Sequence, residues 1–169
     1  MNNSKALRVG DKIVKCNKVY IIFKIKKDKI VDKKETTILF KPYFATEFNK
    51  TLILSIPLDC IDKTNIRLPI SKKELINLFG ELSKHVEAEI AIDISSAKEL
   101  LSLNEPYKSA EVLRRLWLEK SDESASFTQS KEEVFKLAVS QLIEEVAFVG
   151  GYTLKKAKRK MQKALKKKI

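Results

Sequence analysis

The feature that most constrains this chain is a change of hydrophobic period near residue 70. Residues 51–69, TLILSIPLDCIDKTNIRLP, carry an apolar strand pattern that ends at Pro57, because proline lacks the N–H that a further ladder bond needs. Beyond this stretch, apolar residues recur every three to four positions, as on one face of a helix. Because Pro69 disfavours helical geometry in the residue before it, the sequence predicts a β domain over 1–70 and a helical domain over 71–169.

Short strand patterns separated by turns fill the first half of the chain. Gly10 is expected to supply the backbone freedom for a tight turn at Val9–Asp11. Strand, turn, strand spacing of this kind predicts a small antiparallel barrel. The strands are expected at 12–16, 19–25, 36–40 and 52–57, with a charged hairpin tip at 26–34.

Two sets of residues in this half have a structural interpretation. Cys16 and Cys60 form no CxxC pair, so we expect buried free thiols and neither a metal site nor a disulfide framework. Three aromatic residues, Tyr43, Phe44 and Phe48, are expected to cover the core of the barrel.

Helical periodicity after residue 70 predicts five helices, and residues 86–94 between the first two fit neither period clearly. Ser71 and Glu74 match a capping box, and Gly150–Gly151 is expected to end the longest helix. The expected helix starts are Ser71, Ser95 or Ser96, Pro106, Thr128 or Ser130, and Thr153. The expected inward stripes include Leu75, Ile76, Leu78, Phe79 and Leu82 in the first helix, and Val134, Phe135, Leu137, Ala138, Leu142, Ile143, Val146 and Ala147 in the longest.

The net charge of +12 is unevenly distributed along the chain. Residues 1–70 carry +8, residues 71–151 carry −5, and residues 152–169 carry +9 without a single acid. This distribution predicts separate surfaces for separate partners, at least one of which is a polyanion.

The last predicted helix, TLKKAKRKMQKALKKK, surrounds a narrow apolar stripe with cations. The stripe is expected to contain Leu154, Ala157, Met161, Ala164 and Leu165. Lys155 and Lys156 lie in its first turn, where positive charge opposes the helix dipole, and no acidic neighbour is available. An external anion accounts for them, and nucleic-acid phosphate fits best, with an acidic protein or a merely solvated face as alternatives. A membrane surface fits less well, because the apolar stripe has no Phe or Trp anchor. The candidate DNA contacts here are Lys155, Lys156, Lys158, Arg159, Lys160 and Lys163.

Trp117 is the only tryptophan, and it follows Arg114 and Arg115 closely. An indole can stack on a base or wedge between base steps, and arginine can contact phosphate, so these three residues are further candidate DNA contacts. Trp117 also borders an apolar stripe that contains Leu113 and Leu116, so packing in the core is the alternative.

Catalytic and cofactor motifs are missing from the sequence. His85 is the single histidine, and the four glycines form neither GxGxxG nor GxxxxGK[ST]. No apolar run approaches the roughly 20 residues of a membrane span, and the first residues contain no signal-peptide core. We therefore expect a cytoplasmic protein that is not an enzyme and that uses no cofactor, metal, membrane or small-molecule substrate.

Four short motifs follow one another in an order and spacing typical of a known family. They are Val9–Asp11 with Val14, the strand from Leu52 to Pro57, Asn65–Arg67, and Ala110–Leu116. In this order the chain resembles the CarD/CdnL family of bacterial transcription regulators over nearly its whole length. It departs from the family in two places: Asn65 replaces a glycine, and residues 83–103 lack the tryptophan wedge that some members carry in this region.

The resemblance implies a Tudor-like, SH3-like β domain that binds the β subunit of RNA polymerase, and a helical domain that contacts promoter DNA at the upstream edge of the transcription bubble. The β domain resembles that of transcription-repair coupling factor. It implies docking by the edge of one strand, with Arg67 beside it. The docking strand would comprise Leu52, Ile53, Leu54, Ser55, Ile56 and Pro57.

The function expected from the sequence is a nucleoid-associated transcription regulator that docks on polymerase and contacts double-stranded DNA nearby. Docking raises the effective concentration of the DNA-binding surface, so weak contacts that ignore sequence suffice. Two alternatives are a polymerase-independent architectural DNA-binding protein and an RNA or ribosome accessory factor, because small barrels and lysine tails also suit RNA.

Overall fold

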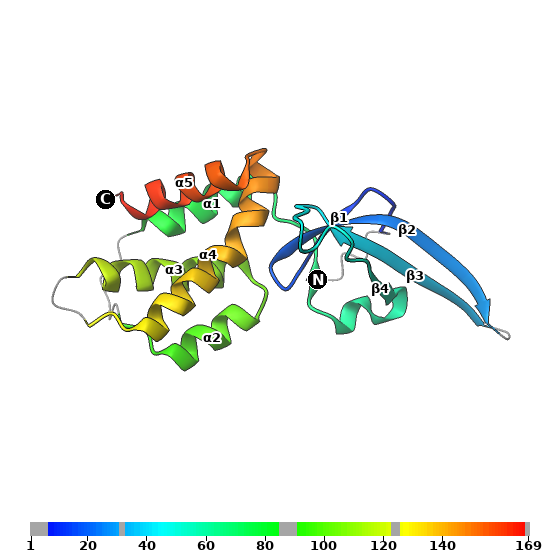
Figure 1. Ribbon diagram of the computed structural model, residues 1–169, viewed down its shortest axis with the longest axis horizontal. Coiled ribbons are helices and arrows are strands. Elements are labelled where there is room, and N and C mark those ends of the chain that lie inside the picture. Colours follow the sequence, from blue (N-terminus) through cyan, green and yellow to red (C-terminus); the bar gives the residue numbers. More distant parts are fainter. Residues whose placement is uncertain (1–6, 31–32, 85–90, 123–125, 168–169) are drawn as a thin grey trace. The chain divides into compact units, whose positions relative to one another are not determined.

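The computed structural model describes residues 7–30, 33–84, 91–122 and 126–167, and its fold is α+β (Figure 1). The chain divides into two compact units, Met1–Pro69 and Ile70–Ile169. The division lies in the segment where the hydrophobic period changes and where Pro69 interrupts both strand and helix geometry.

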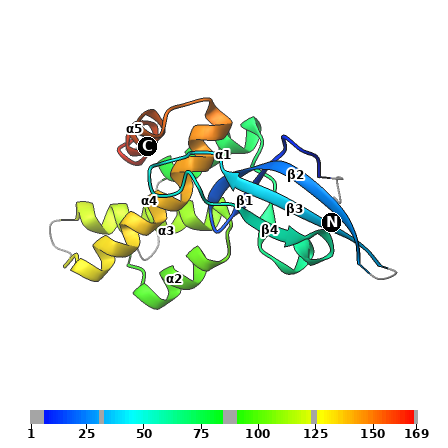
Figure 2. The ribbon, with the colours of Figure 1, turned by 45° about the vertical axis from the view of Figure 1, so that its right-hand side comes forward.

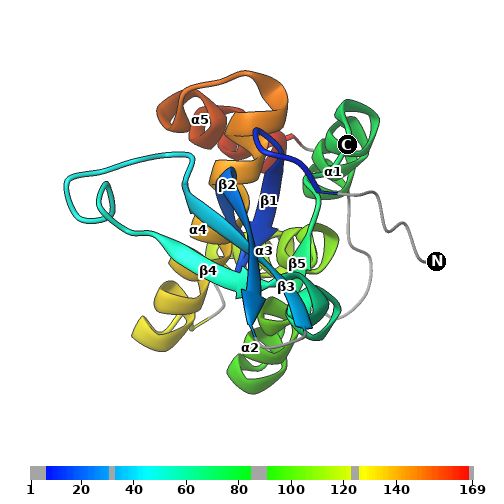
Figure 3. The same ribbon diagram turned by 90° about the vertical axis from the view of Figure 1, so that its right-hand side faces the viewer.

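The first unit is a curled antiparallel sheet of five strands that forms half a barrel (Figure 3). The strand order is β4-β3-β2-β1-β5, with a 3₁₀ helix, η1, at Leu58–Lys63 between β4 and β5. The strands are β1 Lys12–Lys15, β2 Lys18–Ile30, β3 Lys33–Pro42, β4 Leu54–Pro57 and β5 Ile66–Arg67.

The core of this unit is formed by β-branched and aromatic side chains. Ile13, Ile22, Ile38 and Phe40 form one buried cluster. Gly10 adopts a φ of +95°, and its N–H donates to the carbonyl oxygen of Ile22 at 2.8 Å, which confirms the turn before β1. In β3 the buried Ile38 and Phe40 follow the period of two, whereas β1 buries the consecutive residues Ile13 and Val14.

The prediction of a charged hairpin tip at 26–34 is wrong. Strand pairing continues through the expected hairpin tip, where Lys26 pairs with Thr37 and Ile30 with Lys33, because ladder bonds use backbone groups and do not need apolar side chains. Residues 31–32 lie outside the described residues.

The cysteines and the link aromatics also differ from expectation. Cys16 is exposed because it and Asn17, both with positive φ, form the two-residue turn between β1 and β2. Cys60 is half-buried in η1, so neither thiol is fully buried. Phe48 is 100% exposed and Tyr43 is 42% exposed, so these two aromatics do not cover the core, whereas Phe44 is half-buried.

The described residues of the second unit form a bundle of five helices (Figure 2). The helices are α1 Lys72–Ser83, α2 Ile94–Ser102, α3 Pro106–Ser121, α4 Gln129–Gly150 and α5 Leu154–Leu165. The helix α3 contacts α1, α2 and α4, and α5 packs along α1 and α4. Buried leucines from each of these helices, together with Met161 of α5, fill the interior.

Local sequence signals set most of the helix ends. Ser71 and Glu74 form the predicted capping box, Thr128 caps α4, and Gly151 ends α4 in the left-handed conformation with φ 64°. The predicted start of α2 at Ser95 or Ser96 is two or three residues too late, because Asp93 caps the helix: its side chain accepts from the N–H of Ser96 at 2.9 Å. Hydrogen bonds from the side chain and the N–H of Ser96 lower the pKa of Asp93.

Two residues of the predicted inward stripes face solvent. Ile76 is 72% exposed and Leu137 is 42% exposed. In α4 the buried positions Val134, Ala138, Leu142 and Val146 recur every four residues, so the buried stripe is narrower than the sequence pattern predicts. In the residues that the structure describes, no helix has both the length and the apolar character that crossing a membrane requires.

Candidate nucleic-acid and protein interfaces

The helix α5 separates a buried apolar stripe from an exposed basic surface. Ala157, Met161, Ala164 and Leu165 are buried, as predicted, whereas Leu154 of the same stripe is half-buried. The side chain of Thr153 accepts from the N–H of Lys156 at 3.2 Å at the start of the helix. The six predicted contacts are all exposed and form what we call the basic helix surface: Lys155, Lys156, Lys158, Arg159, Lys160 and Lys163.

The charges of the basic helix surface are not neutralised by the described parts of the chain. None of its six cations has a described carboxylate within ion-pair distance, and α5 itself contains no acid. Four of them lie in the first half of the helix, away from the negative end of its dipole: Lys155, Lys156, Lys158 and Arg159. An external anion would therefore interact with them without first displacing an internal partner.

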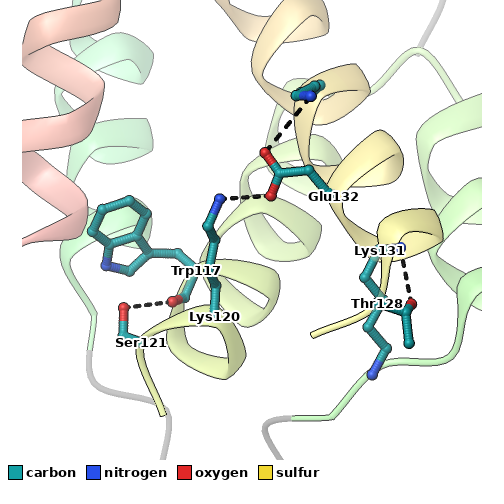
Figure 4. Close-up of polar contacts among 7 residues, drawn as sticks. Trp117, Lys120, Ser121, Thr128, Lys131 and Glu132 are labelled. Carbon is teal, nitrogen blue, oxygen red and sulfur yellow. Dashed lines mark hydrogen bonds and ion pairs between the residues drawn. The ribbon is translucent and has the colours of Figure 1, made fainter. Parts of the chain in front are cut away.

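The lysines of α3 and α4 differ, because they are paired with carboxylates. The Nζ of Lys120 lies 2.6 Å from Glu132, whose other oxygen lies 3.9 Å from Lys136, and Lys131 pairs with the buried Glu119. Figure 4 shows the first of these pairs, in which Lys120 of α3 reaches across to Glu132 of α4. We call these five residues the ion-pair cluster.

Arg114, a predicted DNA contact, is 5% exposed and lies inside the bundle. Its Nε donates to the carbonyl oxygen of Lys84 at 2.9 Å, and its Nη1 donates to that of Leu165. Burial lowers its pKa. Because these bonds occupy the guanidinium at the C-terminal ends of α1 and α5, it is not available to a phosphate, and we leave Arg114 out of the candidate DNA surface.

Arg115 and Trp117 also make contacts within the bundle. The Nη2 of Arg115 donates to the carbonyl oxygen of Ala91 at 2.9 Å, and its side chain is 25% exposed. The half-buried ring of Trp117 stacks on Phe135 with centroids 6.3 Å apart and planes at 29°. Figure 4 shows the backbone carbonyl of Trp117 accepting from the Ser121 hydroxyl at 2.8 Å. The packing alternative thus describes the surroundings of Trp117 better than a free wedge.

The predicted docking strand is only partly a strand. Leu54, Ser55, Ile56 and Pro57 form β4, which pairs with β3 alone among the described strands and so lies at an edge of the sheet. Leu52 and Ile53 precede it and are 41% and 58% exposed. An edge strand flanked by exposed apolar residues can accept a further strand from another chain.

Arg67 does not lie beside this strand in the sheet order. It belongs to β5, where it pairs with Val14 of β1, so three strands separate it from β4 in hydrogen-bonding order. The expectation that it neighbours the docking strand is wrong, because η1 carries the chain to the opposite edge.

The loop between β3 and β4 presents an aromatic residue that the sequence analysis assigned to core cover. Figure 3 shows this loop leaving the sheet in cyan. Asn49 fixes it: its Oδ1 accepts from the N–H of Thr46 at 2.6 Å, and its Nδ2 donates to the carbonyl oxygen of Phe44 at 3.3 Å. Phe48 is fully exposed on this hydrogen-bonded loop, so it is a third exposed apolar side chain between β3 and β4, besides Leu52 and Ile53.

In the parts of the chain that the structure describes, no three His, Cys, Asp or Glu side chains could hold a metal ion together. His85 and most of the segment 86–94, whose period was ambiguous, lie outside the described residues. No known protein-family model and no curated protein sequence matches this chain.

Proposed function

We propose that this protein bridges RNA polymerase and promoter-region DNA, without catalysis, as its resemblance to the CarD/CdnL regulators implies. The observation that carries the proposal is the basic helix surface, whose six exposed cations have no carboxylate partner among the described residues. Each phosphate that such cations neutralise releases counterions, which gives affinity without a need to read bases. Double-stranded DNA is the polyanion that the resemblance favours.

The β unit is, in this proposal, a Tudor-like module that docks on the polymerase β subunit. Its support is the edge strand β4 together with Leu52, Ile53 and Phe48, which we call the docking edge. Main-chain bonds along an added strand would supply affinity, and the exposed apolar side chains would select the partner. Docking would hold the basic helix surface near the promoter, so DNA contacts that are weak in isolation would suffice.

Separate variants of the two surfaces test this division of labour. Replacing Phe48 by Ala and Ile53 by Glu is expected to abolish retention of the chain on immobilised polymerase β subunit and to leave binding to free duplex DNA unchanged. Ile76→Glu is the matched control, because Ile76 is an exposed apolar residue of α1 outside the docking edge. Replacing Lys155, Lys156, Lys158 and Arg159 by Gln is expected to weaken DNA binding and leave polymerase retention unchanged.

The outcome also separates the two alternatives. Wild-type protein that binds duplex DNA but is not retained by polymerase would act as an architectural DNA-binding protein instead. Protein that prefers structured RNA to duplex DNA in direct competition would act on RNA or the ribosome. Either result would contradict the proposal.

A further inference from the structure

Tyr152 lies in the turn that joins α4 to α5, and its backbone position is fixed by the end of α4. Gly151 adopts the left-handed conformation with φ 64°, and its N–H donates to the carbonyl oxygen of Phe148 at 3.2 Å. The N–H of Tyr152 donates to the carbonyl oxygen of Ala147 at 2.8 Å. This pair of bonds is typical of a helix that ends in a Schellman motif. It fixes the backbone of Tyr152 two residues before α5 begins at Leu154.

The ring of Tyr152 packs directly over Gly150. A Cβ atom at position 150 would lie 2.5 Å from Cδ2 and 2.9 Å from Cζ of the ring, and closer still to Cε2. Gly150 is a helical residue without positive φ, so its backbone does not require glycine. Its missing side chain instead leaves the space that the ring occupies.

Two lysines of the basic helix surface lie against the same ring. The Nζ of Lys156 is 5.3 Å from the ring centroid and that of Lys160 is 4.9 Å from it. These lysines are four residues apart and therefore lie on one face of α5. Lys120 also contacts aromatic rings, but it has Glu132 as a partner, whereas Lys156 and Lys160 have no described carboxylate in reach.

We propose that Tyr152 is a positioning residue for nucleic-acid binding, because its ring gathers Lys156 and Lys160 into one two-cation contact for backbone phosphate. Two like charges held near each other repel, and the electron-rich ring face only partly offsets that repulsion. A phosphate group would neutralise both. Side chains that are already held against a ring lose less rotational freedom when the phosphate binds. The inference rests on the proposed function. It identifies Lys156 and Lys160 as the part of the basic helix surface that is held in place before DNA binds.

Two variants separate the aromatic ring from the two lysines, one by removing the ring and one by displacing it. Tyr152→Leu removes the aromatic face, and Gly150→Ala keeps every side chain of α5 but fills the space under the ring. Each is expected to weaken duplex DNA binding by about tenfold, since two long side chains must then be ordered on binding. Gly80→Ala is the matched control, because a Cβ at position 80 of α1 meets no atom within 4 Å. It is expected to bind DNA like the wild type.

A variant that lacks both lysines shows whether Tyr152 acts by positioning them or only by stabilising the fold. In a Lys156→Gln, Lys160→Gln protein, Tyr152→Leu is expected to have no further effect on DNA affinity. An equal loss in both backgrounds would show that the ring only supports the fold and would overturn the inference. If both ring variants bind like the wild type while the four-glutamine variant of α5 loses binding, the positioning role is wrong and the proposed function stands. If wild-type protein does not bind DNA, both fail.

Discussion

The lysines of α4 and those of α5 belong to adjacent helices of one bundle, yet their charges have different surroundings. Lys131 and Lys136 lie within reach of Glu119 and Glu132, whereas the six cations of the basic helix surface have no described carboxylate in reach. Lys131 connects α4 to α3 and Lys136 pairs within α4, whereas the cations of α5 leave charge for a partner outside the chain. A count of lysines does not distinguish the two sets, but the pairing of each lysine does.

Two adjacent arginines, both bonded within the bundle, differ in burial, and this difference predicts the largest effect. Arg114→Met is expected to lower the free energy of unfolding by about 3 kcal/mol, because two buried carbonyl oxygens lose a charged donor. Arg115→Met is expected to cost about 1 kcal/mol or less, since its side chain is more exposed. Urea unfolding of both variants measures the difference. Equal losses of unfolding free energy in the two variants would contradict the prediction that the more buried arginine contributes more to stability.

Breaking one ion pair of the cluster is expected to have a smaller effect on stability. Lys131→Met leaves Glu119, whose side chain is 7% exposed, without its lysine, and should lower the free energy of unfolding by about 2 kcal/mol. DNA affinity should not change. Lys158→Met is the control from α5, with a change in stability below about 0.5 kcal/mol and weaker DNA binding. The comparison would fail if Lys131→Met weakened DNA binding as much as Lys158→Met.

Reversing one charge in the first turn of α5 is expected to move stability and binding in opposite directions. Lys155→Glu places a negative charge at the positive end of the helix dipole and should raise the free energy of unfolding by about 0.5 kcal/mol. The same change removes a phosphate contact, so DNA affinity should fall several-fold. Thermal unfolding and a DNA titration of the same protein sample measure both. A variant that loses stability would show that Lys155 has a structural partner.

Features that depend on neighbouring residues were predictable from the sequence. The Ser71–Glu74 capping box, the Thr128 cap, the turn at Gly10 and the end of α4 at Gly150–Gly151 each need only a few consecutive residues. The buried stripe of α5 was also predictable, because it follows the helical period over the whole element.

Features that depend on distant residues were not predictable in this way. The guanidinium of Arg114 meets carbonyl oxygens 30 and 51 residues away, so the sequence around it did not reveal its burial. Phe48 was assigned to the core by residue type, but the hydrogen bonds of Asn49 hold it on an exposed loop. Tyr152 was missed, although two glycines before an aromatic residue and a lysine-rich helix could have drawn attention to it.

The salt dependence of DNA binding by two matched variants tests the central claim most directly. One variant replaces Lys155, Lys156, Lys158 and Arg159 by Gln, and the other replaces the paired residues Lys108, Lys120, Lys131 and Lys136 by Gln, so both lose four positive charges. The account predicts that the slope of log affinity against log salt becomes shallower by about 3 to 4 for the first variant and stays at the wild-type value for the second. Equal changes in the two slopes would show that only net charge matters and would contradict the account.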